Sequence, residues 1–99
     1  MENSKHHLII EYCPKCGWLL RSAWIAQELL TTFTEELDGI TLKPSSDSGT
    51  FRIYLNGEIF HDRKLHNGFP ELISLKQKLR DKIAPHKSLG HTDSKKYSS

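Results

Sequence analysis

Cysteine is scarce in this sequence. The chain has two cysteines, Cys13 and Cys16, three positions apart. Two are too few for the disulfide framework of a small secreted protein, and a reducing compartment would not preserve a static bridge. A reactive or metal-binding pair is therefore the stronger interpretation.

Long apolar runs are also missing. No segment approaches the roughly 18 apolar residues of a membrane span. Residues 1–7 lack the apolar core of a signal peptide. We expect an unexported, cytoplasmic protein that has no membrane partner.

An excess of charge of one sign is absent as well. Lysine and arginine total 14, aspartate and glutamate total 12, and the net charge is +2. This balance gives no reason to invoke a nucleic-acid partner. The length of 99 residues suits one small domain. We expect a flexible N-terminus over residues 1–7, a folded domain over 8–85 and a polar tail over 86–99.

Apolar periodicity predicts the first two elements. The apolar run His7–Tyr12 predicts a central strand buried on both faces. A helical pattern follows from Gly17-Trp18 to Asp38-Gly39, with Gly39 as its left-handed cap. The predicted apolar stripe of this helix contains Leu19, Ala23, Ala26, Leu30, Phe33 and Leu37.

Turn residues organise the rest of the chain. The short apolar run 40–43, stopped by Pro44, predicts a strand parallel to the first. Asn56-Gly57 predicts a type I′ hairpin turn in which Leu55 faces Glu58, Ile53 faces Phe60 and Phe51 faces Asp62. Pro70 is expected at the first position of a second helix.

These elements predict an α/β fold, in detail an α+β sandwich. The order is β-α-β-β-β-α, with a four-stranded mixed sheet whose first two strands are parallel. An open sheet edge beside the hairpin could pair with a second copy, which would give a homodimer.

The Cys13–Cys16 segment lies at the predicted junction of strand and helix. Unpaired N–H groups and the helix dipole stabilise a thiolate there, and Lys15 adds a positive charge. Pro14 restrains the turn, and two intervening residues let one sulfur release a substrate trapped on the other. Together with the βαβ pattern, the motif favours thioredoxin-like redox chemistry.

Other readings of the pair stay open. Copper(I) or zinc could bind the two thiolates, although no second Cys-x-x-Cys or paired-histidine spacing completes a zinc site. Among the histidines, His66 and His91 are the strongest catalytic candidates. Trp18 follows the dithiol directly, where a partly exposed ring could shield the sulfurs or contact a partner.

Several segments together resemble the SelT/SelW/SelH (Rdx) family, and more narrowly a bacterial cysteine-containing selenoprotein W homologue. They span residues 8–93 and are Tyr12-Cys13-Pro14-Lys15-Cys16-Gly17-Trp18, the helix 19–30, Gly49-Thr50-Phe51, Gly68-Phe69-Pro70-Glu71 and Leu89-Gly90-His91-Thr92-Asp93.

The resemblance implies a thioredoxin-like fold and a redox-active disulfide in cell redox homeostasis, with glutathione or protein thiols as substrates. We expect no cofactor and no metal. The implied site has Cys13 and Cys16 as catalytic residues, and supporting or substrate-contacting residues at Pro14, Lys15, Gly17, Trp18, Thr50 and Phe51. It also suggests that Leu89–Asp93 docks.

The sequence departs from the family pattern in three places. Cys16 stands where many members have selenocysteine, which puts peroxidase-like reactivity in doubt, and Arg52 stands where many have glutamate. Compared with thioredoxins, Gly49-Thr50 replaces the proline before the third strand, so substrate backbone binding differs.

The identity of the attacking sulfur follows from two competing arguments. Thioredoxin logic makes Cys13 the more exposed nucleophile, because the helix tends to bury the second sulfur, whereas the selenocysteine position points to Cys16. For a protein disulfide substrate we favour Cys13. The leading function is a thiol-disulfide oxidoreductase; the alternatives are a redox-switched interaction module without turnover and a copper or zinc carrier.

Overall fold

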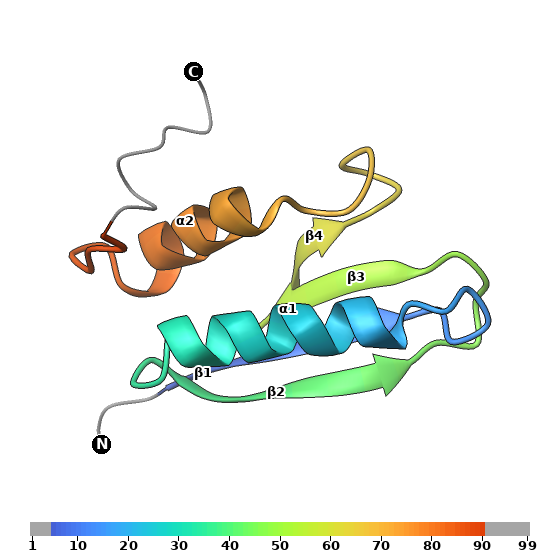
Figure 1. The fold of residues 1–99 in the computed structure, drawn as a ribbon, viewed down its shortest axis with the longest axis horizontal. Coiled ribbons are helices and arrows are strands. Elements are labelled where there is room, and N and C mark those ends of the chain that lie inside the picture. Colours follow the sequence, from blue (N-terminus) through green and yellow to red (C-terminus); the bar gives the residue numbers. More distant parts are fainter. Residues whose placement is uncertain (1–4, 91–99) are drawn as a thin grey trace. The chain divides into compact units, whose positions relative to one another are not determined.

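The computed structural model describes residues 5–90, which divide after Phe69 into two compact units (Figure 1). Residues 1–4 of the expected flexible N-terminus lie outside the described part, as do residues 91–99 of the expected tail, including His91. Among residues 5–90, no helix is long and apolar enough to cross a membrane.

The first unit contains a four-stranded mixed sheet and one helix. Its elements are β1 (His6–Tyr12), α1 (Leu19–Thr32), β2 (Leu37–Pro44), β3 (Phe51–Leu55) and β4 (Glu58–Asp62). The strand order is β2-β1-β3-β4, with β1 parallel to β2 and antiparallel to β3, and with β3 antiparallel to β4. The predicted element order and the predicted mixed sheet are confirmed.

Strand β1 is central in the sheet, but only one of its faces is fully buried. Leu8, Ile10 and Tyr12 are buried, whereas Ile9 and Glu11 on the opposite face are half-buried. The expectation of two buried faces was wrong. Glu11 explains part of the difference, because a carboxylate on that face requires solvent or polar partners.

Helix α1 packs against β1 and β2. Its buried side chains are Ser22, Ile25, Ala26 and Leu29. The predicted stripe was partly wrong: Ala26 is buried, as are Phe33 and Leu37 beyond the helix, but Leu19 and Leu30 are exposed. The predicted apolar stripe did not include Ser22, because serine is polar. Its hydroxyl donates to the carbonyl of Trp18 at 2.8 Å, and this bond lets the side chain face the core.

The helix also ends earlier than predicted. It stops at Thr32 with Phe33 as the C-cap, and Gly39 lies within β2 opposite His7. The expected Gly39 cap was wrong. Threonine side chains account for this end, because the Thr34 hydroxyl bonds the carbonyls of Leu30 and Thr31 and so replaces helical N–H donors.

The hairpin between β3 and β4 has the predicted turn and the predicted pairing of Leu55 with Glu58, but its register differs in the other two predicted pairs. Asn56 and Gly57 have φ values of 51° and 90°, as a type I′ turn requires. The register shifts after Tyr54, so Ile53 pairs with His61 and Arg52 with Asp62. Phe60 is the extra residue of a β-bulge, a feature that the two-residue turn cannot reveal.

The second unit contains α2 (Leu72–Ile83). Glu71 is its N-cap with an extended backbone, so Pro70 precedes the helix and does not occupy its first position as predicted. The apolar side of α2 includes buried Leu75 and Leu79. Arg80 and Lys82 lie in its last turn, where positive charge is favourable.

Candidate functional site

The site lies at one end of the sheet, where three strands meet. Tyr12, the last residue of β1, pairs with Pro44 of β2 and with Phe51 of β3. The N–H of Ser45 donates to the carbonyl of Tyr12 at 2.8 Å. The residues after β1 and β2 and those before β3 therefore come together, and Cys13 stands among them.

Cys13 and Cys16 form a disulfide, and their Cα atoms are 5.3 Å apart. The intervening turn is closed by the N–H of Gly17, which donates to the carbonyl of Pro14 at 3.1 Å. Gly17 has a φ of 77°, a value that glycine adopts without strain. The motif thus occupies a tight turn between β1 and α1.

The two sulfurs differ in their exposure. Cys13 is 1% exposed, whereas Cys16 is exposed. The expectation that Cys13 is the more accessible cysteine was wrong. Helix α1 begins only at Leu19, so Cys16 lies in the turn before the helix and the helix does not bury it.

A cavity of about 310 Å³ lies on the Cys13 side of the turn. Its lining consists of Cys13, Pro14, Lys15, Ser45, Ser46, Asp47 and Ser48. Ser45 is buried, and its hydroxyl accepts the N–H of Asp47 at 3.0 Å, which fixes the start of this loop. The buried sulfur therefore has a polar neighbourhood from the loop after β2.

An aromatic cluster follows the dithiol turn. It consists of Trp18, Phe51 and Phe69, with ring centroids 4.9 Å apart for Trp18 and Phe69 and 5.0 Å apart for Phe51 and Phe69. Phe51 and its neighbour Thr50 are buried, and Trp18 is half-buried. The predicted supporting residues Trp18, Thr50 and Phe51 thus form one side of the site.

Two arginines stack on this aromatic cluster. The Arg21 guanidinium carbon lies 4.0 Å from the Phe69 ring centroid, and that of Arg63 lies 5.0 Å from the Trp18 centroid. Arg63 also donates to the carbonyl of Gly49 at 3.1 Å. Stacking of this kind stabilises a cation against an aromatic face. The half-exposed side of the cluster is therefore positively charged.

A separate ion-pair network links β1, β3 and β4. Arg52 Nε lies 3.0 Å from Asp62 Oδ2, and Arg52 Nη1 lies 3.6 Å from Glu11 Oε1. Burial raises the pKa of Asp62, but the Lys64 N–H and the Arg52 guanidinium outweigh it and hold this pKa below its ordinary value. Arg52, which departs from the family pattern, therefore has a structural partner here.

His66 has a structural contact that the sequence did not suggest. Its Nδ1 accepts the N–H of Asp62 at 2.9 Å, and its ring lies 5.1 Å from that of His61. These contacts hold the loop after β4 in place. Over residues 5–90, no three histidine, cysteine, aspartate or glutamate side chains come together as a metal site.

Sequence reasoning missed several residues around the dithiol. The loop 45–48 could have been found, because parallel strands end at the same sheet edge and β2 was predicted parallel to β1. No comparable sequence pattern indicated that Arg21 and Arg63 lie near the dithiol. They reach the aromatic cluster from a helix and a loop, and only the folded chain brings them together.

Comparisons with known proteins are consistent with this geometry. Residues 7–81 match the model of the Rdx family. Mouse migration and invasion enhancer 1 is 29% identical over 75 residues, which make up 75% of this chain. The chain spans 62% of that relative's length.

Two crystal structures from bacteria resemble the chain closely. The selenoprotein W-related protein from Vibrio cholerae is 48% identical with a TM-score of 0.76, and the match covers 81% of this chain and 99% of that one. A protein from Bordetella parapertussis is 46% identical with a TM-score of 0.77, covering 81% and 100%. The fold is thioredoxin-like, and with a family match over most of its length the chain belongs to the Rdx family, as a selenoprotein W-related member with cysteine at both positions of its motif.

Proposed function

We propose that this protein is a cytoplasmic thiol-disulfide oxidoreductase that acts on glutathione or protein thiols in cell redox homeostasis. The observation that carries the proposal is the pairing of an exposed sulfur, Cys16, with a buried sulfur, Cys13, in one disulfide. An exposed sulfur can meet a substrate, and a buried neighbour can complete the exchange without competing for it.

The reaction runs in two exchanges from the reduced protein. The Cys16 thiolate attacks a substrate disulfide, forms a mixed disulfide and expels one substrate thiolate, which takes up a proton. The Cys13 thiolate then attacks Cys16 Sγ, which releases the second substrate thiol and forms the Cys13–Cys16 disulfide. Two electrons pass from the dithiol to the substrate, and an external thiol reductant returns them.

The surroundings favour this order of attack. Lys15 lies between the two cysteines and also lines the cavity beside Cys13, so its charge does not decide between the sulfurs, whereas the exposure of Cys16 lets solvent stabilise a thiolate there. Asp47 lines the cavity beside Cys13, where a negative charge and burial both oppose a thiolate. The earlier preference for Cys13 as the attacking sulfur is therefore replaced by a preference for Cys16.

Trapping experiments test the proposal. In Cys13→Ser, a mixed disulfide with a substrate thiol should accumulate on Cys16, whereas Cys16→Ser should trap far less. Alkylation and mass spectrometry across a glutathione redox titration should show both cysteines of the wild type protected together as the potential rises. Independent oxidation of the two sulfurs, or trapping only on Cys13, would contradict the mechanism.

A redox-switched interaction module without turnover is the second candidate. It is favoured by the exposed Leu20 and Trp24, which follow the dithiol on α1. Turnover separates the two candidates. An oxidoreductase reduces a model disulfide repeatedly when a reductant is supplied, and both Cys13→Ser and Cys16→Ser abolish cycling. A switch binds its partner in one redox state only and shows no repeated reduction.

A further inference from the structure

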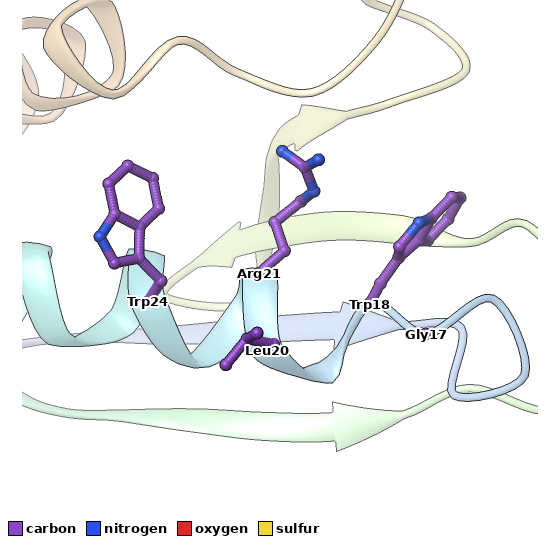
Figure 2. A pocket seen from close by; sticks show the side chains of 5 residues that line it. All are labelled: Gly17, Trp18, Leu20, Arg21 and Trp24. Atoms are coloured by element: carbon purple, nitrogen blue, oxygen red, sulfur yellow. The ribbon is translucent and has the colours of Figure 1, made fainter.

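A groove beside the exposed sulfur has no role in the exchange chemistry described above. Its volume is about 550 Å³, and Gly17, Trp18, Leu20, Arg21 and Trp24 line it (Figure 2). These five residues form what is termed here the docking groove. It begins one residue after Cys16 and continues along the first two turns of α1.

The docking groove has an apolar surface that the fold leaves open. Leu20 is 81% exposed and Trp24 is 49% exposed, and they lie four positions apart on the same side of the helix. The core-facing side chains Ile25 and Leu29 lie on a different side of α1. Exposed apolar side chains that adjoin a reactive sulfur indicate a binding surface.

The charge of the docking groove is positive. Arg21 is its one charged lining residue, and Figure 2 shows its side chain between those of Trp18 and Trp24. Its guanidinium lies over the Phe69 ring, and within residues 5–90 it forms no ion pair. Arg63, stacked on Trp18, adds a second positive charge at the Cys16 end. A carboxylate complements this arrangement.

The length of the docking groove limits its ligand. Leu20 to Trp24 spans four helical steps, or about 6 Å at ~1.5 Å per residue, and Gly17 and Trp18 extend the groove before the helix. The helical part matches about two residues of extended peptide. Glutathione has no aliphatic or aromatic side chain to cover Leu20 and Trp24. A protein segment that carries an apolar residue satisfies both the length and the surface.

We propose that the docking groove binds the segment next to the reacting cysteine of a protein substrate, with an apolar residue against Leu20 and Trp24 and an acidic residue paired with Arg21. This inference rests on the proposed oxidoreductase function and names its substrate class. It makes the protein selective for protein disulfides whose flanking sequence is apolar and acidic, over glutathione disulfide.

Peptide disulfides with a chromogenic thiol leaving group test this selectivity. Three peptides differ only after the cysteine: leucine-glutamate, leucine-lysine and glycine-lysine. The wild type should react with the leucine-glutamate peptide about tenfold faster in kcat/KM than with the glycine-lysine peptide. Equal rates for all three would overturn the proposal.

Charge reversal isolates the contribution of Arg21. In Arg21→Glu, the preference for glutamate over lysine should invert, with a change of about threefold in each rate, as expected for an exposed ion pair. Gln27→Glu, an exposed position of α1 outside the groove, is the matched control and should retain the wild-type preference. An unchanged ratio in Arg21→Glu would contradict the assignment.

The apolar contact has its own control. Leu20→Ala should lower the rate for both leucine peptides several-fold and leave the glycine peptide unaffected, whereas Leu30→Ala, an exposed leucine of α1 outside the groove, should change none of them. Sedimentation of both variants shows whether a second copy occupies this surface. Self-association that is lost in Leu20→Ala would overturn the peptide assignment.

A binding measurement separates failure of docking from failure of the chemistry. The double variant Cys13→Ser, Cys16→Ser cannot exchange disulfides, but its docking groove is retained. Isothermal titration calorimetry with this variant should show binding of the serine analogue of the leucine-glutamate peptide and no binding of that of the glycine-lysine peptide. Selective binding to the double variant, with no turnover by the wild type, would reject the oxidoreductase function and support the docking site. Turnover by the wild type, with no selective binding to the double variant, would support the oxidoreductase function and reject the docking site.

Discussion

At the scale of single residues, solvent reaches the two sulfurs to different extents. In the reduced protein, an alkylating reagent should modify exposed Cys16 faster than buried Cys13, by on the order of tenfold or more, because Cys13 reacts only after local opening. Timed alkylation followed by peptide mass spectrometry measures the ratio. In urea the ratio should approach one, and a preference for Cys13 in the folded protein would contradict the burial described above.

Asp62 makes the stability of the fold depend on pH. Its pKa lies below the ordinary value of 3.8 in the folded chain, so the stabilisation is fully present above that value and is lost as the pH falls through the folded pKa. Asp62→Asn should cost about 1–2 kcal/mol of unfolding free energy at neutral pH, because a part-buried, charge-assisted bond to Arg52 is lost.

Urea denaturation at decreasing pH measures this effect. The difference between wild type and Asp62→Asn should shrink in the acid range where Asp62 becomes protonated. Asp81→Asn is the control, because the Asp81 side chain is 61% exposed and pairs with its sequence neighbour Arg80. It should change the unfolding free energy by less than about 0.5 kcal/mol. A difference for Asp62→Asn that stays constant with pH would argue against the ion pair.

The residue scale was also the hardest to predict. The two cysteines of the candidate site were identified from their spacing, but their relative burial was predicted wrongly, because it depends on where α1 begins. Trp18 was identified because it directly follows the dithiol, and Phe51 came from the family resemblance. Arg21 and Arg63 were missed, since stacking on a ring depends on tertiary placement that no local pattern encodes.

At the scale of elements, glycine is required by its backbone conformation in the hairpin turn at Gly57 but not in the edge strand β2 at Gly39. Gly57 has a φ of 90°, so Gly57→Ala should destabilise the protein by about 1–2 kcal/mol, the cost of placing an alanine in a left-handed conformation. Gly39 lies in β2, and an added Cβ would meet the His7 ring at 3.6 Å, an ordinary contact.

Gly39→Ala is therefore the matched control for Gly57→Ala. It should be neutral or should stabilise the protein by about 0.4–1 kcal/mol, because it restricts the unfolded chain. Thermal and urea unfolding of both variants provide the comparison. If both substitutions had the same effect, the turn geometry would not be the cause.

Elements were predicted well where a local signal specifies them. Asn56-Gly57 correctly gave the turn, and the apolar run before the dithiol correctly gave β1. The boundaries of α1 and the register of the hairpin were wrong for physical reasons. Threonine hydroxyls ended the helix before Gly39, and the bulge at Phe60 moved His61 and Asp62 by one position. Both effects compete with a regular pattern and leave no period of their own.

At the scale of the whole molecule, the sheet order predicts a gradient of local stability. β1 lies between β2 and β3, and the fully buried Leu8, Ile10 and Ile53 lie on these central strands. Hydrogen exchange followed by NMR should show the slowest amides in β1 and β3, intermediate rates in β2 and β4, and the fastest rates in the loop 63–68. Slowest exchange in β2 or β4 would contradict the sheet order.

The fold class was the most predictable property of the molecule. The alternation of strand, helix and strand around Cys13–Cys16 specified a parallel unit, and one hairpin completed the sheet. The division of the chain into 1–7, 8–85 and 86–99 remains a prediction, as do the glutathione substrate and the homodimer. Composition constrains such properties only loosely, because they depend on partners and not on the chain alone.

The burial of Cys13 beside an exposed Cys16 also bears on oxidative damage. A peroxide that reaches the exposed sulfur converts it to a sulfenic acid, and the nearby Cys13 thiol condenses with that group to form the disulfide and water. Cys13→Ser should therefore accumulate sulfinic acid at Cys16, detectable by mass spectrometry, whereas the wild type should not. The turn thus offers a sulfur to the solvent and protects it from irreversible oxidation.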